Sequence, residues 1–438
     1  MHDNVVDSAQ IRRVVRGGIT AFALYIAGVG LAYCSQLAIA RIVSADTYGI
    51  YAYVLAWISV LAYLSALGFD VALLRFLPVY ETNRAWALLR GVIQYAERSV
   101  TLVAAVVVVL GVSFVMLRAD SLSPALKDTF LIGFTLVPVL SLLWIRCSML
   151  RAFGGVVSAV APDRIVRDGT LLVLVLVATL GTRGHVDAPF VMMATLVSSV
   201  LSLGIATTLL HRLQPGVLAN VAPAYAASTW CVTALPLVVM GVTEVFMNRT
   251  GVLLLGWIGD TKSAGVYSVA FNIGFVVTLP RAAINTLFAP TVSALFTQKN
   301  QAILQVLITK SALWTLCAAT FIAASLFVFA EPLLAWFGEE YVVGAPALRI
   351  LLIGHVIAAC AGSQMQVMTM TGSERAAAAL LLLGALSNIV AGAVLIELFG
   401  LAGAAIATAV VQVVLNLAMA LFIWHRLHLL SGVLALFR

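Results

Sequence analysis

Long apolar stretches are the feature that most limits what this sequence can fold into. The stretch from Val232 to Asp260 is apolar over enough residues to cross a bilayer as a tilted helix, and comparable stretches recur along the chain. Of the 438 residues, 63% are apolar and 10% are charged, a balance outside the range of soluble domains of this size. We therefore expect an all-α polytopic membrane protein whose solvent is the lipid bilayer.

The apolar stretches predict twelve membrane spans, each near the ~20 residues that a helix needs to cross the hydrocarbon core. The first six spans are residues 19–40, 50–73, 99–117, 128–149, 165–181 and 189–210. The second six are residues 230–258, 264–295, 309–337, 345–370, 377–397 and 401–424. An even number of spans places both termini on the same side of the membrane.

The distribution of basic residues predicts which side that is. Seventeen of the 25 Lys and Arg residues fall on the side of the two termini, six fall on the other side, and Arg249 and Arg281 lie inside spans. Cytoplasmic loops carry the excess of Lys and Arg, so both termini are expected in the cytoplasm. The same bias explains the net charge of +7, and it does so better than binding to nucleic acid would.

The connections between spans are short. The longest, residues 75–98, interleaves apolar and basic side chains and predicts an amphipathic helix at the cytoplasmic interface, acting as a structural collar. The five cysteines form no CxxC pair and no metal-like spacing. We therefore expect no disulfide framework, no metal and no cofactor.

An internal repeat links the two halves of the chain. The segment Tyr48-Gly49-Ile50-Tyr51 aligns with Ala264-Gly265-Val266-Tyr267, and each copy follows a short polar loop and opens a span. Both copies lie between an outgoing and an incoming helix, so the halves share one membrane orientation. This pattern predicts two six-helix bundles, residues 1–214 and 215–438, related by a pseudo-twofold axis along the membrane normal with a cavity between them.

Two short stretches carry a resemblance to a known family. The first is residues 37–43 followed by Asp46, Tyr48, Gly49 and Tyr51, and the second is residues 67–70 followed by Ala72, Arg75, Phe76, Leu77 and Pro78. They resemble the polysaccharide-biosynthesis transporters, the Wzx-like oligosaccharide flippases of the multidrug/oligosaccharidyl-lipid/polysaccharide (MOP) exporter superfamily. The span count and the doubled layout extend the resemblance over nearly the whole chain.

The resemblance implies a function. Such a protein flips undecaprenyl-pyrophosphate-linked oligosaccharides across the bacterial inner membrane for O-antigen or exopolysaccharide synthesis. It works by alternating access between two lobes, driven by a proton or sodium gradient. The implied partners are the lipid-linked oligosaccharide, membrane lipid, a glycan polymerase and a chain-length regulator, and the protein itself is expected to be a monomer.

Charges inside the seventh span are the strongest candidates for a site. A charge at bilayer depth costs about 2.5–3.5 kcal/mol on insertion scales, so it is expected to face protein or water. Arg249 is the predicted ligand of the pyrophosphate or of an acidic sugar, because its planar fork donates two hydrogen bonds to an oxyanion. The alternative is a structural ion pair with an acid on a neighbouring helix. Glu244 is a poor partner for it, since five residues place the two about 140° apart around a helix.

Three further residues complete the predicted site. Glu244 is the candidate ion-coupling residue, since burial favours a protonated carboxyl group, and Asn248 lies one turn on as a candidate substrate contact. A protonated Glu244 that hydrogen-bonds across helices remains open. Arg281 follows Pro280, which predicts a kink in the eighth span, and it would assist cargo binding or snorkel toward headgroups. Elsewhere, polar residues could line a sugar path or join helices by hydrogen bonds: His355, Gln364, Gln366 and Asn388.

Other classes of protein fit less well. No GxxxxGK[ST] motif occurs, and the outer loops are too short for the site of a membrane glycan polymerase or ligase, so no enzyme is expected. A drug or cation antiporter of the same superfamily is the nearest alternative. Such a protein would need an acidic cavity, whereas two Arg and one Glu occupy the spans here. A lipid II flippase is another alternative, but this sequence has fewer cationic residues in its spans than we expect for that cargo.

Overall fold

The computed structural model describes residues 8–181, 186–298 and 300–433, and over these ranges the chain is helical and contains no strand. It divides into two compact units. Unit 1 is Met1–Val43 with Trp57–Val238, and unit 2 is Ser44–Ala56 with Val239–Arg438. The units divide later in the chain than the predicted lobe boundary at residues 214 and 215. The start of the second helix belongs to unit 2 although it comes from the first half of the sequence.

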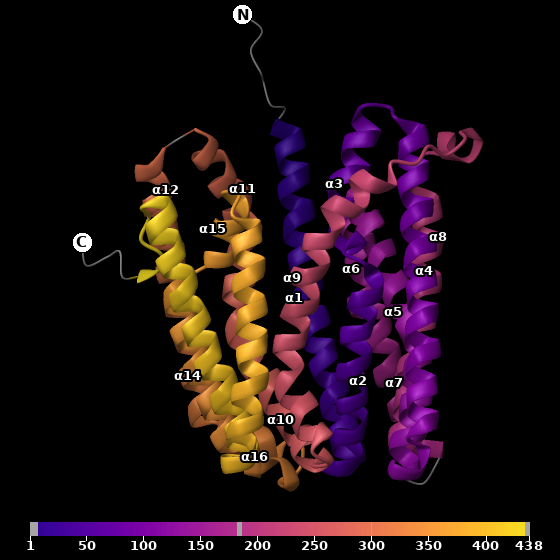
Figure 1. The fold of residues 1–438 in the computed structure, drawn as a ribbon, viewed down its shortest axis with the longest axis vertical. Coiled ribbons are helices and arrows are strands. Elements are labelled where there is room, and N and C mark those ends of the chain that lie inside the picture. Colours follow the sequence, from indigo (N-terminus) through magenta and orange to yellow (C-terminus); the bar gives the residue numbers. More distant parts are fainter. Residues whose placement is uncertain (1–7, 182–185, 299, 434–438) are drawn as a thin grey trace, which may run out of the picture. The chain divides into compact units, whose positions relative to one another are not determined.

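Unit 1 is a bundle of long helices (Figure 1). Within it α5 packs on α3, α4 and α8, and α7 packs on α1 and α8. Its elements are α1 (Ser8–Ile42), the later part of α2 (Ala45–Ala66), α3 (Phe69–Thr82), α4 (Trp86–Leu117), η1 (Ala119–Ser121), α5 (Pro124–Ala152), α6 (Val156–Val160), the π-helical turn η2 (Ala161–Val166), α7 (Arg167–Gly181), α8 (Ala188–Leu213), η3 (Gly216–Asn220) and the first part of α9 (Ala227–Trp257).

Unit 2 is a second helical bundle, in which α14 packs on α10, α12 and α16, and α11 packs on α12 and α15. Its elements are the first part of α2, the later part of α9, α10 (Thr261–Phe275), η4 (Val276–Thr278), α11 (Leu279–Thr297), α12 (Gln301–Val328), α13 (Ala330–Ala335), η5 (Glu339–Gly344), α14 (Ala345–Ala361), α15 (Gln364–Met370) and α16 (Glu374–Leu427).

The predicted all-α membrane fold is confirmed. Nine helical stretches of the described chain are long and apolar enough to cross a membrane by length and composition, and Ile26–Ile42 is a shorter apolar helix. The longest stretch, α16, contains two of the predicted spans, and η2 with α7 contains the predicted span 165–181. The kink predicted at Pro280 falls next to the 3-10 turn η4, which lies between α10 and α11, and Pro280 lies in the first turn of α11.

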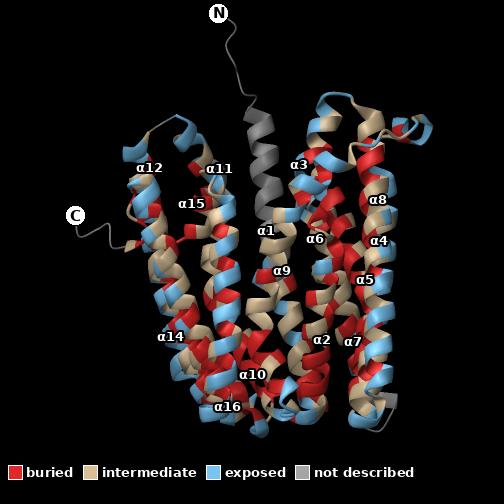
Figure 2. Ribbon diagram, viewed as in Figure 1, coloured by how far each residue is buried: buried red, intermediate tan, exposed pale blue. Residues whose placement is uncertain are grey.

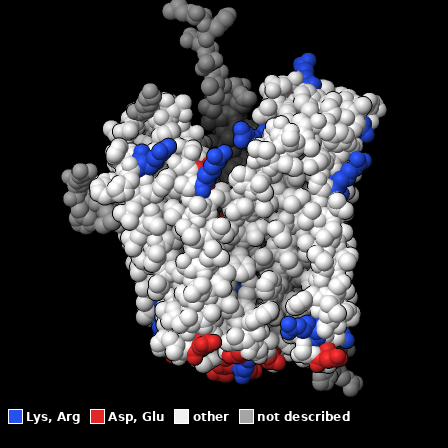
Figure 3. All heavy atoms as spheres, viewed as in Figure 1, with Lys and Arg blue, Asp and Glu red and all other residues white. Residues whose placement is uncertain are grey.

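Exposed side chains on the long helices are largely apolar. On α4, Leu102 is 66% exposed and Val109 is 64% exposed, and buried residues run along the inner sides of each unit (Figure 2). On the face in Figure 3, charged atoms gather near the ends of the helices, and the surface between is almost free of them. An apolar belt of this kind suits contact with hydrocarbon rather than water.

The prediction of one amphipathic helix over residues 75–98 is wrong. Helix α3 ends at Thr82, Arg84 adopts a positive φ of 53°, and α4 begins at Trp86. Leu77, Leu89 and Val92 are fully buried in the same hydrophobic core. The apolar side chains that looked like the membrane-facing stripe of an interface helix thus pack into unit 1 from two helices joined by a tight turn.

Helix α16 is a hairpin of two arms. Gly400 has non-helical angles, φ 56° and ψ −131°, and separates the arms. A Cβ on Gly384 would lie 3.2 Å from Leu415, and Gly403 packs against the backbone of Leu395. In each pair, one residue lies before Gly400 and the other lies about as far after it, as expected for two antiparallel helices joined at Gly400.

The chain that follows α16 folds back into unit 2, and we call residues 428–432 the C-terminal strap. Gln305 of α12 holds Leu430 by two hydrogen bonds, Nε2 to the Leu430 carbonyl at 2.8 Å and the Leu430 amide to Oε1 at 2.9 Å. Gln364 donates to the Ser431 hydroxyl at 2.9 Å. Gly432, at φ 79°, lies so close to the break between α14 and α15 that a Cβ would be 3.0 Å from Ala361 Cα. The strap therefore ties α12, α14 and α15 to α16.

Candidate functional site

The two repeated glycines meet in unit 2. A Cβ added to Gly265 would lie 2.9 Å from Gly49 Cα, and one added to Gly49 would overlap the Thr261 carbonyl. The Thr261 hydroxyl donates to the Asp46 carboxylate beside this crossing. The absence of side chains at both positions lets the start of α2 and the start of α10 approach closely.

A group of buried tyrosines surrounds the same region. Tyr48 is 2% exposed, and its ring lies 6.2 Å from that of Tyr51 and 6.0 Å from that of Tyr341. The Tyr48 hydroxyl also forms a hydrogen bond with the Ser268 side chain. These rings come from α2 and η5, so residues from both halves of the sequence build one layer within unit 2.

Arg249 faces this tyrosine layer. It lies eight residues before the end of α9 at Trp257, about 12 Å along the helix, and it is partly buried. Its charge interacts with the Tyr48 and Tyr51 hydroxyls. No carboxylate among the described residues forms an ion pair with it. The structural ion pair considered from the sequence is therefore not found in this part of the chain.

Glu244 and Arg281 form an electrostatic pair. The Glu244 carboxyl on α9 interacts with the guanidinium of Arg281 at the start of α11, without a direct ion pair. Glu244 is exposed and Arg281 is partly buried. As expected from its place on the helix, Glu244 has a different neighbour from Arg249. Asn248 lies between the two on α9 and makes no hydrogen bond to any residue that the structure describes.

His355 of α14 adds a group that the sequence left undecided. It is 6% exposed, and its Nδ1 lies 3.4 Å from Nε2 of Gln412 on α16. Its Nε2 has no hydrogen-bond partner in the described chain. Arg281 acts on it electrostatically. The two predicted site residues Glu244 and Arg281 and the undecided His355 thus belong to one group, while Arg249 belongs to another.

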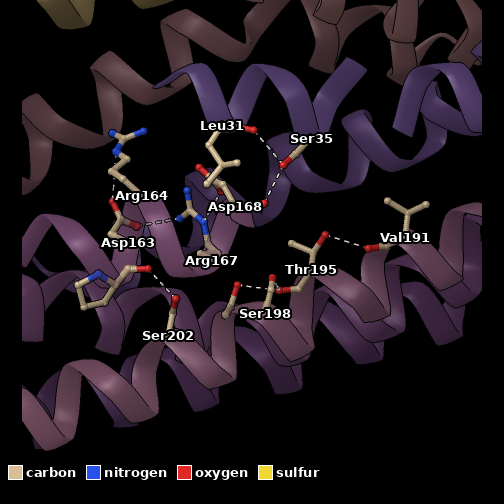
Figure 4. A network of polar contacts seen from close by, with 12 residues as sticks. Leu31, Ser35, Asp163, Arg164, Arg167, Asp168, Val191, Thr195, Ser198 and Ser202 are labelled. Carbon is tan, nitrogen blue, oxygen red and sulfur yellow. Dashed lines mark hydrogen bonds and ion pairs between the residues drawn. The ribbon is translucent and has the colours of Figure 1, made fainter. Parts of the chain in front are cut away.

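Unit 1 contains a charge network that sequence reasoning missed (Figure 4). Arg167 donates to Asp163 at 2.8 Å and to Asp168 at 3.0 Å, and Asp163 also pairs with Arg164 at 3.4 Å. Asp168 is 6% exposed, and its Oδ2 is a buried oxygen without a partner in the described ranges. Asp163 and Arg164 lie just before the predicted span 165–181 and Arg167 and Asp168 at its start, and no role is predicted for them from the sequence. The four-residue spacing of Asp163 and Arg167, which fits one helix face, was the available signal.

A π-helical turn positions this network. The turn η2 spans Ala161–Val166 between α6 and α7, and the Ser202 hydroxyl donates to the Pro162 carbonyl at 2.6 Å. Ser35 of α1 donates to the Asp168 carbonyl at 2.7 Å. Helix α8 thus binds a carbonyl of the turn and α1 binds a carbonyl of the first turn of α7, so both sides of the charged segment are held by neighbouring helices.

Comparisons with known proteins agree with this architecture. The profile of a family described as Polysaccharide biosynthesis protein matches residues 14–296, and a profile described as MatE matches residues 236–394. No functionally curated protein matches the sequence.

Solved structures share the fold. One is an inward-facing multidrug resistance MATE family transporter of the MOP superfamily, with a TM-score of 0.71, 13% identity and coverage of 94% of this chain and 98% of that chain. Another is the lipid II flippase MurJ in an inward closed conformation, with a TM-score of 0.69, 15% identity and coverage of 92% and 87%. A MOP superfamily transporter from Pyrococcus furiosus has a TM-score of 0.61, 16% identity and coverage of 96% and 94%.

Proposed function

Because this chain belongs to the polysaccharide biosynthesis protein family of the MOP superfamily, we propose that it flips a lipid-linked oligosaccharide across the bacterial inner membrane. The cargo is an undecaprenyl-pyrophosphate-linked glycan, and transport follows alternating access of two lobes, residues 1–214 and 215–438. Both termini lie in the cytoplasm. The protein acts as a monomer, without catalysis or cofactor, and supplies a glycan polymerase and its chain-length regulator.

The observation that carries the proposal is the unpaired cation at Arg249. A guanidinium within a membrane helix that has tyrosine hydroxyls for neighbours, and no carboxylate ion pair in the described chain, keeps its charge available for an anion. A pyrophosphate or an acidic sugar supplies that anion, and its planar oxygens match the fork of Arg. Asn248, one residue earlier, is a neutral group that can bond to sugar hydroxyls. Arg281 assists as a second cation.

Ion coupling is assigned to Glu244. Its carboxylate partly neutralises Arg281, so proton uptake by Glu244 would release the positive charge of Arg281 toward the cargo. A sodium ion bound by the carboxylate would act in the same direction. The gradient would then change the affinity of unit 2 for an anion through a single pair of residues.

The test uses proteoliposomes that contain the purified protein and a fluorescent polyprenyl-pyrophosphate-linked oligosaccharide, with flipping measured by chemical quenching from outside. Arg249→Ala is expected to slow flipping at least about tenfold, the loss of one charged hydrogen bond. Arg249→Lys should be intermediate, since it keeps the charge and loses the fork. Glu244→Gln should remove the response to a pH gradient. Wild-type rates in all three variants would reject these assignments.

A drug or cation antiporter is the second candidate, favoured by the MatE profile over residues 236–394, which includes Glu244. An antiporter would use Glu244 to bind a cationic drug and would gain nothing from Arg249. Efflux of cationic dyes from cells, measured beside glycan complementation, separates the two. Dye efflux that depends on Glu244, with no flipping by the wild-type protein, would favour the antiporter.

A further inference from the structure

The orientation of the His355 ring is fixed from two sides. Gln412 of α16 donates its amide N–H to Nδ1 at 3.4 Å, which leaves the ring proton on Nε2. On the other side, a Cβ on Gly274 would lie 3.7 Å from Cδ2, the atom bonded to Nε2. The Cδ2 edge of the ring, which carries Nε2, therefore lies near the end of α10, where η4 leads into α11 and Arg281.

The Nε2–H group of His355 has no hydrogen-bond acceptor among the described residues. Nε2 is buried without a partner in the described residues, and leaving a buried donor unpaired costs about 1–3 kcal/mol. Neither a bilayer nor an apolar core supplies an acceptor there. The Phe271 ring, which lies 6.4 Å from the imidazole at an edge-on angle, is an apolar neighbour and supplies no acceptor. A donor kept at this cost is the mark of a group that meets its acceptor in another state of the protein.

Helix α11, which follows η4, supplies complementary groups. Arg281 and Asn285 are four residues apart and so lie on one face. The charge of Arg281 acts on His355, and Arg281 has no direct carboxylate partner in the described chain. The Asn285 Oδ1 is a second buried atom without a partner. The described part of unit 2 therefore contains one cation, one unpaired donor and one unpaired acceptor: Arg281 is linked to His355 electrostatically and shares a helix face with Asn285.

We propose that Arg281, His355 and Asn285 form a subsite that binds an anionic oxygen and an adjacent hydroxyl of the cargo. The guanidinium and the His355 Nε2–H donate to the anionic oxygens, and the Asn285 Oδ1 accepts from the hydroxyl. The anion belongs either to the carrier pyrophosphate or to an acidic sugar. The inference rests on the proposed flippase function, and it makes His355 a specificity-determining residue.

Binding to the purified full-length protein in detergent tests the subsite. The probes are farnesyl pyrophosphate, inorganic pyrophosphate and glucuronate, titrated by calorimetry. His355→Leu should weaken the preferred anion about tenfold to a hundredfold, the loss of one hydrogen bond to a charged group. His355→Gln should retain most of the affinity, because its amide N–H can occupy the place of Nε2–H. Asn285→Asp should weaken binding further by repelling the anion.

The pattern across probes identifies the source of the anion. Tight binding of both pyrophosphates assigns the subsite to the carrier, and preference for glucuronate assigns it to the sugar. Asn388→Leu is the matched control, since Asn388 is a buried amide whose Nδ2 already lies 3.5 Å from the Met247 carbonyl. Wild-type affinity in His355→Leu would overturn the subsite, even where Arg249→Ala still abolishes flipping. If the wild-type protein flips no lipid-linked glycan, the proposed function fails instead.

Discussion

Gly49 and Gly265, which occupy equivalent positions in the two sequence repeats, lie against each other in unit 2. A Cβ on Gly265 would be 2.9 Å from Gly49 Cα and 2.6 Å from the Ala45 carbonyl oxygen. The repeat therefore has a physical reason as well as a duplicated origin. Each copy supplies the small residue that the other copy needs for close helix contact.

Replacing either glycine by alanine is expected to destabilise unit 2. Overpacking against backbone atoms costs about 1–3 kcal/mol, because a backbone cannot move aside as a flexible side chain can. The melting temperature of the detergent-solubilised protein should fall in Gly49→Ala and Gly265→Ala. Gly204→Ala is the control, since nothing lies within 4 Å of its added Cβ. Equal melting temperatures for all three variants would contradict the crossing.

The charge network of unit 1 predicts that the stability losses from substituting Arg167 and Asp163 are not additive. Arg167→Met leaves Asp168 without its cation and Asp163 with Arg164 as its one ion-pair partner in the described chain, and should cost about 3–5 kcal/mol. Combining it with Asp163→Leu should restore part of the loss, because a paired charge is removed together with its partner. Arg164→Met should matter less, since its side chain is 38% exposed. Thermal unfolding of Arg167→Met, Asp163→Leu, their combination and Arg164→Met measures these differences, and strictly additive losses would argue against the network.

The Glu244–Arg281 pair predicts a weak coupling in stability. Glu244 is exposed and not in direct contact with Arg281, so the double-mutant cycle of Glu244→Gln and Arg281→Gln should give less than about 1 kcal/mol. The same cycle should show a larger coupling in transport, because the cargo competes with the carboxylate for Arg281. Thermal unfolding and proteoliposome flipping provide the two measurements. A strong coupling in stability with none in transport would mark the pair as structural.

The hydrogen bonds of the C-terminal strap predict that protein stability depends on the Gln305 side chain. Gln305→Leu removes both hydrogen bonds to Leu430 and should cost about 1–3 kcal/mol. Gln301→Leu, four residues earlier on the same helix and exposed, should leave the melting temperature unchanged. Limited proteolysis should also cleave near residues 428–432 faster in the Gln305 variant. An intact strap after this substitution would show that Leu429 and Gly432 hold it unaided.

Span count and fold class could be predicted because they depend on local sequence. A helix that crosses a bilayer satisfies its own backbone, so an apolar run of sufficient length is enough to identify it. The kink at Pro280 was predicted for the same reason, since a proline acts on its own helix. The family resemblance at the first spans likewise depended on a few adjacent residues, and the family profile confirms it.

The missed features depend on contacts between distant residues. Leu77 and Leu89 look like one amphipathic stripe in the sequence, and only their common core shows that a turn separates them. Asp163 lies just before the predicted span 165–181 and Arg167 just inside it, and only the π-helical turn shows that the two form an ion pair. His355 could not be singled out, since its significance comes from Gln412 on one side and an unpaired nitrogen on the other. The role of Arg249, Arg281, Asn248 and Glu244 in transport remains a prediction.

The single-residue reversal at Gly400 has a consequence for experiments on whole cells. Two membrane-crossing arms join there without a loop, and Gly403 packs closely on the backbone of Leu395. Although Leu398 and Phe399 at this end of α16 are 67% and 57% exposed, the junction offers no loop in which an epitope or a protease site could be inserted. Reporters of membrane sidedness for these two arms should be attached at the far end, near Glu374 or His428.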